Sequence, residues 1–384
     1  MLWKTLLPLY LTEFFMRSMF VLPIWILFFQ SRGLTLVDIG FVSTGTYIAS
    51  VLLEYPSGIF ADRYGRKNSL LIAIAFSVLS FLVEIYSFSV TGFFVSALLN
   101  GASWAFTSGA REALIFDLLK SVKSHKLNSV ILGRLDAVGA IGSVVSVALG
   151  SVFYKTSAVL PYWLTIISAV LGFLSLLFLK EPKYSSGRAG LFSHFKEGVL
   201  LVFSTPVIKS LLLLYVPLFF FEEAWYNASQ PILVGLSLPV VMLGLYSSFK
   251  ILFSAIGGLF LPLLLKRFSH FSLFAFIVIL EASSWLFLGS DSLFFVIIFS
   301  YVLLLIHQLW VYVDGDAIHK HIPSRLRASV LSGRQTVLSI LFVFNPWLMG
   351  WLVNTFPRSS LFGIFAGIVL VLGAFVLFIR RRLF

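Results

Sequence analysis

Two adjacent carboxylates, Glu222 and Glu223, stand in a long apolar stretch of the 384-residue chain, with no lysine or arginine close to them in sequence. Neighbouring carboxyl groups in a medium of low dielectric constant cannot both ionise cheaply, so at least one is expected to hold a proton near neutral pH. This pair is therefore the leading candidate for a proton carrier. The alternative is that both side chains lie near the outer surface, in contact with water.

Two pairs of opposite charges also fall in apolar segments. Glu13 and Arg17 are four residues apart, which places both on one face of a helix and predicts an ion pair. Arg111 and Glu112 are neighbours whose side chains point about 100° apart, so only one of them can face a common cavity squarely. A charge at the centre of a bilayer costs about 2.5–3.5 kcal/mol on insertion scales and usually faces a cavity or a partner. Each pair is either structural or part of a binding site.

Other polar and aromatic residues extend these groups. His307 can change its charge near physiological pH, although a lone histidine is more often a hydrogen-bonding group. Tryptophan rings suit cationic or planar molecules through their faces, and they suit sugars equally well. Glu281 is expected to pair with Lys250, and Asp136 has no assigned partner. The candidate residues for binding substrate or protons are Glu13, Arg17, Arg111, Glu112, Glu222, Glu223, Trp225, Asn227, His307 and Trp310.

The composition indicates that these residues belong to a membrane protein. Hydrophobic residues make up 59% of the chain and charged residues 11%, whereas soluble domains carry about 25% charged residues. A mean hydropathy of +1.00 leaves too little polar surface to cover a soluble core, so the apolar residues must face lipid. The net charge of +12 comes from basic residues in short loops and does not indicate a nucleic-acid partner.

Several classes of chemistry find no support in the sequence. The absence of cysteine excludes disulfides, thiolate metal sites and thiol catalysis. The sequence contains no glycine-rich nucleotide-binding loop, no metal-ligand cluster and no recognisable nucleophile–base set. We therefore expect that the protein is not an enzyme and needs no cofactor or metal.

Twelve apolar segments are long enough to cross a bilayer as helices. They cover residues 6–29, 38–60, 69–88, 91–118, 129–153, 159–179, 207–231, 239–265, 271–289, 292–317, 328–353 and 360–380. With the N-terminus inside, 22 of the 28 lysines and arginines lie in inner loops and tails, and three, Arg32, Lys155 and Arg358, lie in outer loops. This bias predicts a multi-pass protein of the plasma or inner membrane with both termini in the cytoplasm. The first segment lacks a cleavage site, so we interpret it as an uncleaved helix.

The two halves of the chain repeat each other in the same direction. Residues 129–134 (SVILGR) match residues 329–334 (SVLSGR) at an offset of 200. Three further matches keep the same order at offsets of 200–205: Lys4 and Tyr10 with Lys209 and Tyr215, Gly33–Leu36 with Gly235–Leu238, and Arg66-Lys67 with Lys266-Arg267. Parallel halves are related by an axis along the membrane normal, and one half can rock against the other around a central cavity.

The predicted domains follow from this repeat. A six-helix bundle covers residues 1–180, a cytoplasmic linker covers 181–206, and a second six-helix bundle covers 207–384. Within the linker, Phe192, Phe195, Val199 and Val202 recur at three- and four-residue steps. This spacing indicates a short amphipathic helix, Leu191–Phe203, on the inner leaflet.

The segment after the second apolar helix, GIFADRYGRK at residues 58–67, resembles the signature of the major facilitator family of transporters. The twelve spans, the linker at mid-chain and the parallel halves resemble the same family over essentially the whole chain. The resemblance implies an all-α integral membrane fold of two parallel six-helix bundles. It also implies a protein that works as a monomer in the lipid bilayer and alternates between inward-open and outward-open states.

In that family, the signature loop latches the inner side shut in the outward-open state. The resemblance implies that Asp62 accepts hydrogen bonds from the N-terminus of helix 11, near Ala328, and that Arg66 pairs with Asp117. The two glycines would permit a close helix contact and a tight turn. The alternative is that the loop charges only set the topology. The predicted latch residues are Gly58, Asp62, Arg63, Gly65, Arg66, Lys67 and Asp117.

Two signatures of drug/proton antiporters in that family are missing. Ala97 stands where an arginine is common in the fourth span, and Ser146 and Val147 stand where the fifth span usually has Gly-Pro. The predicted function is still a secondary transporter, working by proton-coupled export of amphipathic or drug-like small molecules. A symporter or uniporter for a polar metabolite such as a sugar is the alternative.

A sensor or an intramembrane enzyme built on the same fold is the third possibility. The complete latch motif disfavours it, because a latch matters only to a protein that alternates. The expected partners are the lipid bilayer, a small-molecule substrate and protons.

Overall fold

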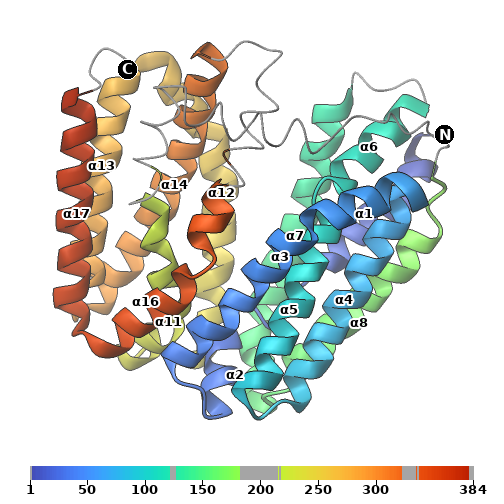
Figure 1. Cartoon of the computed structure of the whole chain (residues 1–384), viewed down its shortest axis with the longest axis horizontal. Helices are drawn as coiled ribbons and strands as arrows, with labels where there is room; N and C mark the ends of the chain where they lie inside the picture. Colours follow the sequence, from blue (N-terminus) through green and yellow to red (C-terminus); the bar gives the residue numbers. More distant parts are fainter. Residues whose placement is uncertain are drawn as a thin grey trace. The chain divides into compact units, whose positions relative to one another are not determined.

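The computed structural model describes residues 2–121, 127–181, 215, 218–321, 334 and 337–379, and the regular elements in these ranges are all α-helices (Figure 1). Nine described segments are long and apolar enough to cross a membrane, and two shorter apolar helices cover Leu6–Met16 and Val240–Ser254. The predicted all-helical membrane architecture is confirmed. The count of twelve spans remains a prediction, because parts of the seventh and eleventh segments lie outside the described ranges.

The first half of the chain contains eight helices in the described ranges: α1 (Leu2–Met16), α2 (Trp25–Ser31), α3 (Leu36–Tyr64), α4 (Arg66–Tyr86), α5 (Val90–Thr107), α6 (Ala110–Ser121), α7 (Asn128–Thr156) and α8 (Leu160–Leu177). The described part of the second half contains α11 (Glu222–Gly235), α12 (Val240–Arg267), α13 (His270–Leu288), α14 (Leu293–His321), α16 (Asn345–Thr355) and α17 (Arg358–Ile379).

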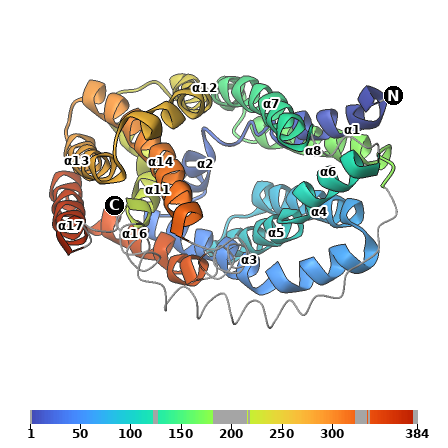
Figure 2. The same ribbon diagram turned by 90° about the horizontal axis from the view of Figure 1, so that it is seen from above.

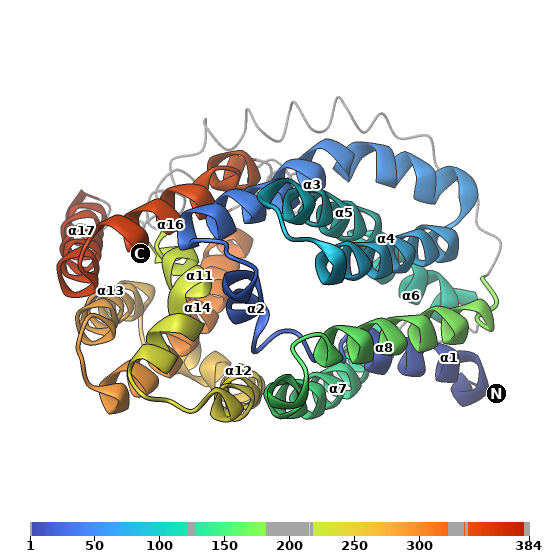
Figure 3. The same cartoon turned by 90° about the horizontal axis from the view of Figure 1, so that it is seen from below.

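These helices form two units. One unit comprises residues 1–188 and 239–251, and the other comprises residues 189–238 and 252–384. In the first unit α5 packs between α3 and α4 (Figure 3), and in the second α13 packs along α14 and α17 (Figure 2). The domain boundaries at residues 180 and 207 remain predictions, and the amphipathic helix proposed for the linker lies outside the described residues.

The first membrane segment is broken in the middle, whereas the sequence predicted one continuous span over residues 6–29. Helix α1 ends at Met16, irregular backbone follows, and α2 begins at Trp25. The Ser18 hydroxyl donates to the Phe14 carbonyl at 2.7 Å, a bond that bends helices. Pro23 lacks the N–H that a continuous helix would need. The prediction failed because residues 6–29 are long and mostly apolar despite Glu13 and Arg17, and hydropathy does not register these two local signals.

Helix α7 supports the broken segment through its glycines. A Cβ atom at Gly142 would lie 2.5 Å from the Phe14 carbonyl oxygen, and one at Gly150 would overlap the Phe20 carbonyl oxygen. Only residues without a side chain permit this approach of α7 to the bent backbone. Irregular backbone at membrane depth is tolerated where protein surrounds it or where it lines a cavity.

The fourth membrane segment is also interrupted, between α5 and α6. Ser108 and Gly109 separate the two helices, and Gly109 has φ = 69°, a left-handed conformation that glycine adopts without strain. The span predicted over residues 91–118 is present as one candidate membrane segment, Val90–Ser121, but it consists of two helices. The break is next to Arg111 and Glu112, two candidate site residues.

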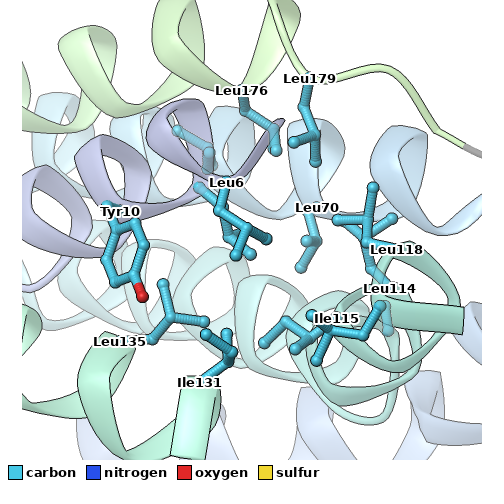
Figure 4. Packing of buried hydrophobic residues seen from close by; sticks show 14 of the residues in the cluster. Leu6, Tyr10, Leu70, Leu114, Ile115, Leu118, Ile131, Leu135, Leu176 and Leu179 are labelled. Carbon is cyan, nitrogen blue, oxygen red and sulfur yellow. The ribbon is translucent and has the colours of Figure 1, made fainter. Parts of the chain in front are cut away.

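Two apolar clusters fill the first unit on either side of the break in the first segment. The first cluster joins α1, α4, α6, α7 and α8 through Leu6, Tyr10, Leu70, Leu114, Leu118, Ile131, Leu135 and Leu176 (Figure 4). The second cluster contains Val21, Ile24, Phe28, Phe81, Phe93 and Tyr162. In lipid these contacts stabilise the bundle by close packing more than by exclusion of water. Along the first segment, Glu13 and Arg17 lie between the residues that enter the first cluster, Leu6 to Tyr10, and those that enter the second, from Val21 onward.

Candidate functional site

Arg66, the first residue of α4, connects three helices. Its guanidinium group forms an ion pair with Asp117 of α6, and Nη1 donates to the Ala113 carbonyl at 2.8 Å. Its backbone N–H donates to Glu181 Oε1, beyond the end of α8, at 2.6 Å. The predicted Arg66–Asp117 contact is therefore present. The carboxylate of Glu181 caps the positive end of α4, as expected for an anion at a helix N-terminus. Nothing in the sequence pattern indicated this role.

Gly65 and Lys67 complete the connections of this loop. Gly65 has φ = 101°, and a Cβ atom there would lie 2.7 Å from Glu181 Oε2, so both the turn and the cap require glycine. Lys67 Nζ donates to the carbonyls of Leu177 and Leu179 at 2.7 and 2.8 Å. These carbonyls end α8, where a cation is favourable.

The other predicted latch residues behave differently. A Cβ atom at Gly58 would meet no described atom within 4 Å, so the close helix contact expected there is wrong for the part of the chain that the structure covers. Close contacts occur instead at Gly101, against the Thr46 carbonyl. Arg63 is exposed, with its guanidinium group 5.3 Å from the Tyr64 ring centroid.

Asp62 is also exposed. Its expected partner, the start of helix 11 near Ala328, lies outside the described residues. That part of the latch remains a prediction.

A closed ring of four charges occupies the first unit between the two apolar clusters. Arg111 donates from Nε to Glu13 at 2.5 Å and from Nη2 to Asp136 at 2.9 Å. Arg17 donates from Nη2 to the same Asp136 oxygen at 3.0 Å, and its Nε lies 3.6 Å from Glu13. Each carboxylate therefore contacts both guanidinium groups. The predicted Glu13–Arg17 pair is present, as half of this four-charge ring.

Asp136 is the member of the ring that the sequence left unassigned. It lies in α7, three residues before Gly139, where a Cβ atom would be 2.7 Å from Arg17 Cδ. Glycine at that position therefore lets the arginine cross α7 and reach the carboxylate. Glu112 takes no part in the ring: it is exposed and has no hydrogen bond or ion pair with a described residue.

In the second unit His307 of α14 lies between two glutamates. Its Nδ1 is 2.8 Å from Glu222 Oε2 on α11, at the distance of an ion pair but outside hydrogen-bond geometry. Its Nε2 is 3.1 Å from the Leu218 carbonyl oxygen and 3.6 Å from Glu281 Oε2. The second oxygen of Glu281 accepts from Trp285 Nε1 at 2.9 Å. We call His307, Glu222 and Glu281 the histidine cluster.

The histidine cluster revises two expectations from the sequence. Glu281, fully buried on α13, contacts His307 and Trp285, while the ammonium group of its expected partner Lys250 lies 5.9 Å from the Tyr246 ring centroid. His307 is not a lone histidine, because two carboxylates face it. These contacts join three helices, and no spacing within one helix could have indicated them.

Of the remaining candidates on α11 and α14, Trp225, Asn227 and Trp310 are buried and Glu223 is half-buried. Glu223 accepts a long hydrogen bond of 3.4 Å from Asn227. Trp225 packs near Phe362, and Trp310 packs on Phe274 with its ring fully buried. Both tryptophans lie within aromatic packing, so their contact with a substrate remains a prediction.

Stacked rings connect the histidine cluster to a second ion pair. Phe219 stacks on His307 at a centroid distance of 4.6 Å, and Tyr215 stacks on Phe219 at 4.1 Å. The guanidinium group of Arg334 lies 5.1 Å from the Tyr215 ring centroid and forms an ion pair with Asp314. The described part of the second unit thus has its own arginine–aspartate pair.

Comparisons with known proteins agree with this architecture. The sequence model of the Major Facilitator Superfamily matches residues 6–313. The MFS-type transporter YxaM of Bacillus subtilis (strain 168) is 26% identical over 235 residues, 58% of this chain and 56% of the relative. The quinolone resistance protein NorA of Staphylococcus aureus is 26% identical over 220 residues, 55% of this chain and 55% of the relative. The matches span about half the length of these curated relatives.

Solved structures also resemble the whole chain. The nucleoside transporter NupG aligns with a TM-score of 0.74 and 17% identity, covering 97% of this chain and 98% of that one. At this level of identity the likeness shows the fold alone.

Proposed function

Because the chain belongs to the Major Facilitator Superfamily, whose matched members are membrane transporters and not enzymes, we propose that it exports amphipathic small molecules in exchange for protons. It would do so by alternating access in the plasma membrane, with both termini in the cytoplasm. The likeness to a quinolone resistance protein supports export of drug-like compounds. The histidine cluster supports the coupling to protons.

The contact between His307 and Glu222 carries the proposal. His307 Nε2 faces the Leu218 carbonyl, which can only accept a hydrogen bond, so the Nε2 atom bears a hydrogen. A neutral ring would then place an unprotonated Nδ1 atom 2.8 Å from the Glu222 carboxylate oxygen. Two electronegative atoms at this distance repel each other when neither carries a hydrogen. The contact is favourable only when the pair holds a further proton, on the ring or on the carboxyl group.

The charge of the cluster changes when that proton leaves. With a protonated ring and two ionised glutamates the formal charge is −1, and loss of the ring proton makes it −2. Glu281 is fully buried and His307 is 6% exposed, so solvent screens the charge at these two groups poorly, whereas the Glu222 side chain is 39% exposed and gives water a route to the proton. A bundle in lipid is expected to rearrange when such a charge develops, and the rearrangement can drive the alternation between states.

The experiment uses the full chain in proteoliposomes that contain a pH-sensitive dye, with ethidium, norfloxacin or D-xylose added outside. For an antiporter, entry of ethidium or norfloxacin expels protons, and the internal pH rises above the change seen in empty liposomes. We expect Glu222→Gln and His307→Gln to abolish this proton flux. Glu223→Gln is the matched control, because its carboxylate contacts Asn227 and not His307.

Two outcomes would contradict the proposal. Transport of ethidium without any change of internal pH would reject proton coupling. A fall of internal pH on entry of D-xylose, with no response to ethidium or norfloxacin, would favour a proton-coupled sugar symporter.

A further inference from the structure

We propose that the four-charge ring of the first unit, Glu13, Arg17, Arg111 and Asp136, binds a zwitterionic head group of the transported molecule. This inference extends the proposed function, since it names the class of amphipathic substrate. The ligand would carry an ammonium group and a carboxylate beside an apolar body. Its carboxylate would pair with Arg17 and its ammonium group with Asp136.

The ring has a buried half and an exposed half. The side chains of Glu13 and Arg111 are 9% and 19% exposed, and those of Arg17 and Asp136 are 44% and 52% exposed. The exposed half therefore consists of one cation and one anion, 3.0 Å apart. A ligand can reach both of them, while the buried pair stays in place behind.

Charge balance decides which ligands this arrangement favours. The ring has two positive and two negative groups, so it is formally neutral. A ligand with a single negative charge would pair with Arg17 but would be repelled by Asp136 beside it. A ligand with a single positive charge would pair with Asp136 but would be repelled by Arg17. A zwitterion can take both exposed groups as partners and leave the ring neutral. Charges that would end without a partner in a low-dielectric site are costly, which selects against the singly charged ligands.

The backbone around the ring is also typical of a binding site. Arg17 directly follows the end of α1, where the first membrane segment is irregular, and its carbonyl accepts from Ser143 of α7 at 2.8 Å. Arg111 is the second residue of α6, just after the break between α5 and α6. Discontinuous helices at mid-membrane commonly form substrate sites in transporters. Two breaks therefore meet at one group of charges.

The test compares three fluorescent probes that share one apolar body and one chain. Nε-dansyl-lysine carries both charges, dansylcadaverine carries only the ammonium group, and dansyl-6-aminohexanoate carries only the carboxylate. Binding to the full chain in lipid nanodiscs is followed by dansyl fluorescence, without a pH gradient. We expect dansyl-lysine to bind at least about ten-fold more tightly than either analogue, since each charged contact adds a charge-assisted hydrogen bond.

Two variants remove one exposed charge each. Asp136→Asn is expected to erase the preference for dansyl-lysine over the probe that carries only the carboxylate. Arg17→Gln is expected to erase the preference for dansyl-lysine over the probe that carries only the ammonium group. Arg134→Gln is the matched control, because Arg134 is an exposed arginine of the same helix with no contact to the ring. Arg17→Lys keeps the charge and should keep most of the preference. Thermal unfolding of each variant shows whether it is folded.

Equal binding of the three probes to the unaltered protein would overturn the proposal. So would a preference for dansyl-lysine that survives in both folded variants. Binding is measured at equilibrium without a pH gradient, so equal binding of the three probes would contradict this inference and not the proposed proton coupling. Equally, a missing proton flux would contradict the proposed coupling and not the binding preference.

Discussion

The guanidinium group of Arg66 and the carboxylate of Asp117 form an ion pair that connects the start of α4 to α6. Both side chains are 18% exposed, so the pair is partly protected from water. The same guanidinium group also donates to the Ala113 carbonyl, which fixes its direction. This pair is the best-defined contact of the proposed latch.

Neutralising this pair should impair transport. Asp117→Asn removes the charge partner of Arg66, and hydrogen bonds to charged groups contribute about 1.5–3 kcal/mol. We expect the turnover rate to fall at least about ten-fold while binding of substrate at equilibrium changes little, because the latch contacts no substrate. Arg63→Gln is the control, since Arg63 is exposed and its guanidinium group lies over the Tyr64 ring, away from Asp117. Full turnover in Asp117→Asn would show that the pair only sets topology.

Two glycines of the signature segment, Gly58 within α3 and Gly65 at its end, should respond differently to alanine. At Gly65 the backbone has φ = 101°, and a methyl group would lie against the Glu181 carboxylate that caps α4. We expect Gly65→Ala to cost about 1–3 kcal/mol in backbone strain alone and to lower both thermal stability and transport. Gly58→Ala places its methyl group where no described atom lies within 4 Å. Comparable loss of transport in both variants would contradict this account.

The contact of α3 with α5 depends on Gly101. A Cβ atom there would overlap the Thr46 carbonyl oxygen and lie 2.9 Å from the Ala49 Cβ atom. Backbone cannot move aside as a side-chain end can, so Gly101→Ala should push the helices apart at a cost of about 1–3 kcal/mol. We expect a lower unfolding temperature by tryptophan fluorescence in detergent. Gly133→Ala, in open space on α7, should leave that temperature unchanged or raise it.

The sequence predicted those features that depend on pattern along the chain. Long apolar runs predicted the membrane helices, and the resemblance of the signature segment to that of the major facilitator family predicted Asp117 as the partner of Arg66. Glu13 and Arg17 were paired correctly because their four-residue spacing places them on one helix face. The contact between Glu13 and Arg17 is encoded locally.

The contacts between distant segments were not predictable in this way. Asp136 joins Arg17 and Arg111, and His307 joins Glu281, only because separate helices lie side by side, and hydropathy along the chain does not show which side chains then meet. Hydropathy indicates that a charge within the membrane needs a partner, but it does not identify that partner. The break after Met16 was missed for a related reason: the apolar run continues, while the glycines that accommodate the bend are in α7.

The ion pair of Arg334 and Asp314 allows a test of whether the two charges act as a unit. Both side chains are 9% exposed, and removing one partner of a buried pair typically costs about 3–5 kcal/mol, because the other charge remains unpaired. We expect Asp314→Asn and Arg334→Gln each to lower the unfolding temperature strongly, and the double variant to recover part of that loss. Additive losses would mean that the two residues do not act as a pair. Arg134→Gln, at the matching position of the first half, should leave the unfolding temperature unchanged, because Arg134 is exposed.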